Sequence, residues 1–149
     1  MGFRKILAVG LLLAAPTPAF AADVTVGVLA PLTGRFASYG LQFNGAIKQF
    51  EDSGHAALSG GNRMKLVLYD TRGDLTEAIN STRRLVSSEN AVTIVGPLLS
   101  GEAEVAFPVA GQGKTPIISP SSAKPGVAAA NRPYGFQFAS TSEIGRAHV

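Results

Sequence analysis

The sequence predicts an α/β fold built around a parallel sheet. Short runs rich in valine and isoleucine recur along the chain, and such runs are typical of strands that are buried on both faces. Segments with apolar residues at helical spacing separate these runs, and glycine or proline marks the boundaries. Strands that alternate with helices form right-handed βαβ units, in which neighbouring strands run in the same direction. The pattern therefore predicts one parallel sheet covered by helices.

The first strand and the first helix follow the N-terminal segment. Val24–Ala30 is a valine-rich run that we expect to be a buried strand, and Pro31 and Gly34 end it. A helix is expected from about Ser38 to Asp52. Its apolar residues recur near helical spacing at Leu41, Ala46, Ile47 and Phe50.

A second strand and a capped helix follow a turn at 59–62. Met64–Tyr69 alternates polar and apolar residues before its end, as a strand does. Asp74 and Glu77 fit a capping box, in which Asp74 accepts a backbone N–H and Glu77 reaches back. The residues expected to point inward from this helix are Leu75, Ala78, Ile79 and Leu85, and those expected to point outward are Arg83 and Arg84.

Three more strands and one more helix complete the pattern. Ala91–Val95 is an apolar run stopped by a Gly-Pro pair. A helix is expected over Gly101–Ala110, kinked or shortened by Pro108 because proline lacks the N–H and crowds the preceding turn. The last two strands are expected at Thr115–Ile118 and Tyr134–Phe138.

Residues 1–21 have the three parts of a secretory signal peptide. Arg4 and Lys5 are positive, Ile6–Ala15 is apolar, and Ala19–Ala21 fits the small-residue cleavage pattern. The apolar run is too short to cross the ~30 Å hydrocarbon core of a bilayer. We therefore expect cleavage after Ala21 and a periplasmic location for the mature chain.

The composition excludes several classes of function. The net charge is +3, but Arg4 and Lys5 supply two of these charges, which leaves the mature chain near +1. No basic stripe remains, so no nucleic-acid partner is expected. Cysteine is absent, which excludes a disulfide framework, a thiolate metal site, a cysteine nucleophile and a cysteine-linked lipid anchor. His55 and His148 lack a partner at ligand spacing, so we expect no metal and no cofactor.

Catalytic motifs are also missing from the sequence. The run Gly111–Thr115 resembles part of a phosphate-binding loop, but Pro108 stands where that motif needs glycine, and the run leads into a strand instead of opening a helix. No dinucleotide motif follows the first strand, and no serine lies in a hydrolase elbow. We expect no catalytic residue, and no enzyme.

Three polar loops are expected at the carboxyl edge of the sheet, at 31–39, 96–100 and 119–124. Ligands of open parallel sheets bind at this edge, near helix N-termini. Small hydroxyl residues and glycines expose backbone N–H groups there, which bind an anionic group such as a carboxylate. A single serine is better explained as an ordinary helix cap, but three such loops favour a binding site. The polar residues are Thr33, Ser38, Tyr39, Ser100, Ser119, Ser121 and Ser122.

Five segments resemble the branched-chain amino acid (Leu/Ile/Val-type) solute-binding proteins of ABC transporters, which have the type I periplasmic-binding fold. Their order and spacing match from Val24 to about Ser140. The segments are Gly27–Gly34, Ala37–Gly40, Tyr69–Asp74, Val95–Pro97 with Ser100 and Gly101, and Pro116–Ser121. The resemblance implies the N-terminal lobe of a two-lobed receptor, with a parallel sheet in flavodoxin-like order, that closes on an amino acid or similar small polar solute. It also implies a permease partner in the inner membrane.

The resemblance carries roles over to five residues. The Ser100 position hydrogen-bonds the α-carboxylate of an amino acid, the Ser121 position contributes backbone groups, and the Tyr39 position packs near the ligand's side chain. Ala123 departs from the pattern, because relatives usually have threonine there, and Ser122 is a possible substitute for the missing hydroxyl. If it is not, amides, urea or aromatic acids become alternative ligands. A sensory domain of the same fold is the alternative function.

The C-terminal residues suggest that the chain is a piece of a longer protein. Ile144–Val149 is the translation of ATC GGA AGA GCA CAC GTC, which resembles a short-read sequencing adapter. Members of the family are more than twice as long as this chain. We therefore expect 22–142 to be a partial, truncated N-terminal lobe and 143–149 to be a non-native tail.

Overall fold

The computed structural model describes residues 23–122 and 124–138. The expected signal peptide at 1–21, the expected tail at 143–149 and Ala123 lie outside the described residues. Strands and helices alternate along the chain, as the sequence predicts. The elements are β1 (Asp23–Ala30), α1 (Ala37–Asp52), the 3-10 turn η1 (Ser59–Gly61), β2 (Arg63–Asp70), α2 (Leu75–Ser87), β3 (Thr93–Val95), α3 (Ser100–Gln112), β4 (Ile117–Ser119), α4 (Val127–Ala130) and β5 (Gly135–Gln137).

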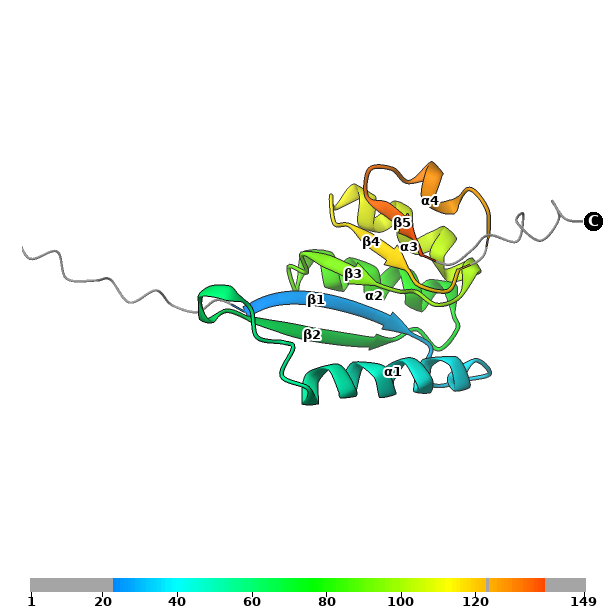
Figure 1. The fold of residues 1–149 in the computed structure, drawn as a ribbon. Coiled ribbons are helices and arrows are strands. Elements are labelled where there is room, and N and C mark those ends of the chain that lie inside the picture. Colours follow the sequence, from blue (N-terminus) through cyan, green and yellow to red (C-terminus); the bar gives the residue numbers. More distant parts are fainter. Residues whose placement is uncertain (1–22, 123, 139–149) are drawn as a thin grey trace, which may run out of the picture.

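The five strands form one sheet in the order β2-β1-β3-β4-β5, and all four pairs are parallel. This is the flavodoxin-like order, and it confirms the predicted fold class. Because every strand runs in the same direction, all five carboxyl ends lie at one edge of the sheet (Figure 1). That edge carries the three predicted polar loops.

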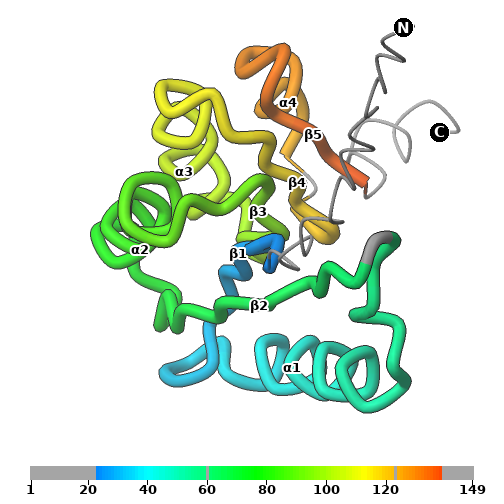
Figure 2. The backbone as a smooth tube through the Cα atoms, turned by 90° about the vertical axis from the view of Figure 1, so that its left-hand side faces the viewer, coloured from blue at the N-terminus to red at the C-terminus, as the bar shows by residue number. Residues whose placement is uncertain are grey.

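One face of the sheet packs against α2 and α3, while α1 lies on the other side (Figure 2). The main core forms on the α2 and α3 side. Ile94 and Ile117 are register partners in β3 and β4, and both are fully buried with Leu29 against Leu85 and Phe107. Gly27 and Gly135 belong to the same rows, and an added Cβ there would meet Leu85 and Phe107. Burial of these side chains provides most of the apolar stabilisation of the domain.

The opposite face is covered only in part. Val28, Val95, Ile118 and Phe136 are successive register partners across β1, β3, β4 and β5, so they share this face. Val28 is buried, Val95 and Ile118 are partly buried, and Phe136 is 49% exposed. We call Val95, Ile118 and Phe136 the open face. The helix on this side, α1, packs along β1 near β2, and among the described residues no helix covers β4 and β5 on this face.

Two local expectations are wrong. The helix α3 runs for 13 residues through Pro108 and is not shortened, because the apolar residues around Pro108 are buried against the sheet and outweigh one lost hydrogen bond. Leu75 is 48% exposed although we expected it to point inward, and it is the first residue of α2. Within α1, Leu41 and Ala46 are exposed, and only Gly40 is buried.

One of the two predicted capping-box hydrogen bonds of α2 is present. The side chain of Asp74 accepts the backbone N–H of Glu77 at 2.8 Å, which satisfies one free donor of the first turn. The backbone N–H of Asp74 itself donates to the carbonyl of Thr71 at 2.8 Å, so Glu77 is not needed for the reciprocal bond. The short helix α4 is absent from the sequence prediction, because four residues show no periodicity.

Within 23–122 and 124–138, none of the helices has the length and apolar character required to cross a bilayer.

Candidate ligand-binding site

Two of the predicted loops are joined by serine hydroxyls at the carboxyl edge. Ser119, the last residue of β4, donates its hydroxyl hydrogen to the carbonyl oxygen of Pro97 at 2.7 Å and accepts the backbone N–H of Ser122 at 3.0 Å. The hydroxyl of Ser121 donates to the carbonyl oxygen of Leu98 at 2.7 Å. The loops after β3 and β4 are therefore tied side by side by bonds between side chain and backbone.

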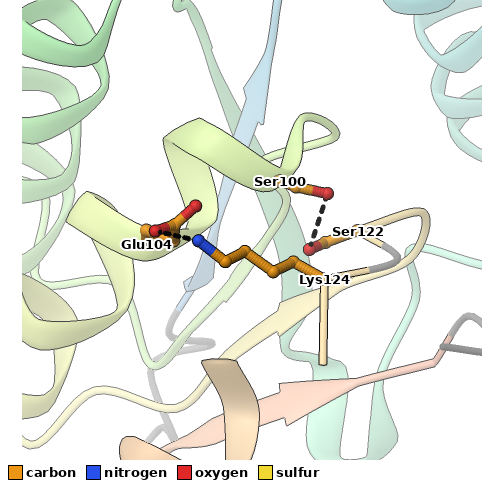
Figure 3. Close-up of polar contacts among 4 residues, drawn as sticks. All are labelled: Ser100, Glu104, Ser122 and Lys124. Atoms are coloured by element: carbon orange, nitrogen blue, oxygen red, sulfur yellow. Dashed lines mark hydrogen bonds and ion pairs between the residues drawn. The ribbon is translucent and has the colours of Figure 1, made fainter. Parts of the chain in front are cut away.

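The structure brings Ser100 and Ser122 together. Ser100 is the first residue of α3, and its Oγ lies 3.4 Å from the Oγ of Ser122 (Figure 3). Ser122 is only 1% exposed, whereas Ser100 is partly buried. Of the two residues, Ser100 is therefore the more exposed at this edge.

An ion pair braces the loop that carries these serines. Lys124 and Glu104 are joined at 2.6 Å, and both side chains are largely exposed. Figure 3 shows the lysine side chain extending from the β4–α4 loop to α3. The side chain of Gln137 in β5 adds a bond from its Nε2 to the carbonyl oxygen of Ser122. Sequence reasoning did not identify Glu104 or Gln137, because each partner lies 15 or more positions away in the chain.

The two other predicted site residues are Tyr39 and Ala123. Tyr39 lies in the first turn of α1 and is 61% exposed, so its ring is open to a ligand or a further part of the protein. Ala123 is outside the described residues.

Asp70 organises the loop that leads to Tyr39. It is the last residue of β2, and its carboxylate accepts the backbone N–H groups of Leu32 at 2.8 Å and Thr33 at 3.3 Å. It also accepts the Thr33 hydroxyl at 2.6 Å and the backbone N–H of Arg72 at 2.9 Å. Burial alone would raise the pKa of Asp70, but the Thr33 hydroxyl and the three N–H groups together outweigh it and lower the pKa. Asp70 therefore stays ionised and holds the loop after β1 in place.

Two glycines allow backbone segments to pack closely at the same edge. The loop after β3 starts at Gly96, which has φ +105° and lies so near β1 that an added Cβ would be 2.2 Å from the carbonyl oxygen of Leu29. A Cβ on Gly40 would be 2.1 Å from the carbonyl oxygen of Pro31. Both positions require glycine for space, and Gly96 also requires it for its backbone conformation.

The site has the features of a binding edge for a small polar or anionic molecule. The hydroxyl of Ser100 lies at the N-terminus of a 13-residue helix, where the helix dipole favours negative charge. The described residues contain no group of three or more His, Cys, Asp or Glu arranged to hold a metal ion. The arrangement can bind and orient a ligand through hydrogen bonds.

Comparison with known sequences finds binding proteins in each case. The family model described as periplasmic binding protein matches residues 23–147. An amino acid binding protein of Pseudomonas aeruginosa is 35% identical over 129 residues, which cover 84% of this chain and 34% of that protein. The Leu/Ile/Val-binding protein BraC3 of Rhizobium johnstonii is 30% identical over 105 residues, which cover 70% of this chain and 28% of that protein. The chain thus spans about a third of the length of these curated relatives.

Solved structures show the same lobe. The branched-chain amino acid transporter substrate binding protein LivJ of Streptococcus pneumoniae, in complex with isoleucine, matches with a TM-score of 0.73 and 26% identity over 80% of this chain and 34% of that chain. A solute binding protein of an ABC transporter from Rhodopseudomonas palustris, in complex with 3,4-dihydroxy benzoic acid, matches with a TM-score of 0.72 and 25% identity over 80% of this chain and 32% of that chain.

Proposed function

Because the chain belongs to the periplasmic binding protein family, we propose that it carries half of the solute-binding site of an ABC-importer receptor. The solute is an amino acid or a similar small polar molecule that carries a carboxylate. The receptor binds this solute without transforming it and delivers it to a permease in the inner membrane. The segment at 1–21 directs the protein to the periplasm.

The observation that carries this proposal is the convergence of the loops after β3 and β4. Ser100 stands at the N-terminus of α3, and the hydroxyl of the buried Ser122 is bonded to its hydroxyl. A carboxylate at this point accepts the Ser100 hydroxyl and backbone N–H groups of the first helical turn, as anions do at helix N-termini. Ser121 and Ala123 supply backbone groups from the neighbouring loop, and Tyr39 packs against the rest of the solute.

An aromatic carboxylic acid is the second candidate ligand. The protein from Rhodopseudomonas palustris that resembles this chain was crystallised with 3,4-dihydroxy benzoic acid. In this chain, alanine at position 123 lacks a side-chain hydroxyl that would pair with the ammonium group of an amino acid. A carboxylate without an ammonium group needs no such partner.

Calorimetry on the full-length gene product tests both candidates. We would titrate leucine, isoleucine, valine and alanine, followed by 3,4-dihydroxybenzoate and 4-hydroxybenzoate. Binding of one amino acid that Ser100→Ala weakens supports the first candidate, and binding of a benzoate with the same dependence supports the second. If neither group binds, or if Ser100→Ala changes nothing, the proposed site is wrong.

A further inference from the structure

Each polar group of Ser122 is bonded to a different element of the fold. Its backbone N–H donates to the Oγ of Ser119, the last residue of β4, at 3.0 Å. Its carbonyl oxygen accepts the Nε2 of Gln137 in β5, and its hydroxyl donates to the Oγ of Ser100 in α3 at 3.4 Å. Because Ser122 is only 1% exposed, water has little access to replace any of these partners.

The register of the sheet explains how two of these partners meet. Ser119 and Gln137 are register partners in β4 and β5, so their side chains point to the same face of the sheet. That face is the one that α3 covers, because a Cβ added to Gly135, two residues before Gln137, would meet Phe107 of α3. Ser122 therefore lies between the ends of β4 and β5 and the first turn of α3.

The side-chain amide of Gln137 is the donor that the buried carbonyl of Ser122 requires. A buried carbonyl oxygen that loses its donor costs free energy, and the loop avoids this cost only by turning the carbonyl towards water. Such a turn would move the hydroxyl of Ser122 away from Ser100 and shift the backbone of Ser121, which precedes it. The bond from Gln137 thus determines the position of the whole loop after β4.

The ion pair between Lys124 and Glu104 is a second support of the same loop (Figure 3). Both of its side chains are largely exposed, and water and salt weaken ion pairs in such positions. The bond between Gln137 and Ser122 is partly buried, so it is less screened. We therefore expect Gln137 to be the stronger of the two supports.

We propose that Gln137 is a positioning residue of the solute site. Its amide holds the backbone of Ser122, and this orients the hydroxyl of Ser100 and the backbone groups of Ser121 towards the carboxylate of the solute. The inference rests on the proposed function, because it assigns a role in binding at Ser100. If the loop is released, only the fraction of molecules with the loop in place can bind, and the apparent affinity falls by that fraction.

Two substitutions at position 137 separate the loss of the donor from the gain of a charge. Gln137→Glu keeps the shape but places a carboxylate, which is only an acceptor, against the carbonyl oxygen of Ser122. Gln137→Met removes the donor without adding a charge. The matched controls are Gln112→Glu and Gln112→Met, at the exposed last residue of α3, and they leave binding unchanged.

Calorimetry on the full-length gene product uses leucine or 3,4-dihydroxybenzoate, whichever the parent protein binds more tightly. We expect Gln137→Met to raise the dissociation constant at least about fivefold at any pH, which is the lower end for a buried polar group that loses its partner. Gln137→Glu should raise it by at least as much at about pH 8 and approach the parent value at about pH 5. Burial raises the pKa of the new carboxyl, and its protonated form donates a hydrogen bond again.

The pH comparison is made against the parent protein at the same pH. Charged groups near this position include Lys124, Glu104 and Arg132, the last of which lines a cavity beside β5 together with Gln137, and both variants keep them. If Gln137→Met lowers the folded fraction, the recovery of Gln137→Glu at low pH tests the proposal within one protein.

Two results would overturn the role of Gln137. One is an unchanged affinity in Gln137→Met, which would show that only the added charge of Gln137→Glu affects binding. The other is a loss in Gln137→Glu that does not depend on pH, because the missing donor would then not be its cause. If the parent protein binds neither probe, the proposed function fails and this inference fails with it, whereas normal binding by both variants removes Gln137 alone.

Discussion

The hydroxyl of Ser122 donates a hydrogen bond to the hydroxyl of Ser100, with 3.4 Å between the two Oγ atoms. The bond joins the first residue of α3 to the loop after β4, and Ser122 is buried whereas Ser100 is only partly buried. We therefore predict that Ser100 contacts the ligand and that Ser122 supports Ser100, and substitutions should separate the two effects.

Ser100→Ala should weaken solute binding by about 1.5–3 kcal/mol, or roughly 10- to 150-fold, because a hydrogen bond to a charged carboxylate is lost. Ser122→Ala should cost about 1 kcal/mol or less, since it removes support and no ligand contact. Calorimetry on the full-length protein measures both. A larger effect of Ser122→Ala than of Ser100→Ala would reverse the assigned roles.

The pH dependence of stability should report Asp70. Its folded-state pKa is lowered, so its contribution is fully present above the unfolded value of about 3.9 and is lost as pH falls through the lower folded value. Asp70→Asn should destabilise the protein by about 1 kcal/mol at pH 7 and reduce the loss of stability below pH 4 (roughly the unfolded pKa). Urea unfolding from about pH 2.5 to 7 measures this. If the variant loses as much unfolding free energy at low pH as the parent protein, other carboxylates cause the acid destabilisation.

Two glycines of α1 should respond in opposite directions to alanine. Gly40→Ala places a Cβ 2.1 Å from the backbone carbonyl oxygen of Pro31, and backbone cannot move aside, so we expect a loss of at least about 2 kcal/mol. Gly45 has nothing within 4 Å of an added Cβ, so Gly45→Ala should stabilise by about 0.5–1 kcal/mol through helix propensity. The free energies of unfolding of the two variants check this, and similar values would show that α1 does not hold the loop as described.

The open face should make residues 22–149 poorly soluble when they are expressed alone. Val95, Ile118 and Phe136 form a continuous apolar row there, and Phe136 is 49% exposed. We expect aggregation, and no amino acid bound more tightly than about 1 mM, since one lobe provides only part of the contacts. Phe136→Lys should improve solubility, which size-exclusion chromatography measures. A monomer that binds with micromolar affinity would show that this segment is a complete binding domain.

The fold was largely predictable because its signals are local. The valine-rich run of β1 and the isoleucines of β3 and β4 report burial on both faces, and parallel strands then place the loops after β1, β3 and β4 at one edge. The hydrogen-bond partners of the serine hydroxyls were not predictable. The bond between Ser119 and Pro97, for example, spans 22 positions and depends on the register of two strands. The burial of Glu102, which is only 1% exposed, was not predictable for a different reason. An acidic residue in the first turn of a helix is ordinarily read as a favourable exposed charge, and nothing in the sequence indicates its burial.

The hydroxyls of Ser119 and Ser121 point at main-chain carbonyls of the neighbouring loop, at 2.7 Å each. The loss of conformational entropy for these loops therefore occurs during folding, before any solute arrives. Binding at a preorganised edge carries a small ordering cost, so the affinity for a solute depends mainly on its own desolvation and fit. This edge should accordingly discriminate between solutes by their shape and charge, with little rearrangement of its own backbone.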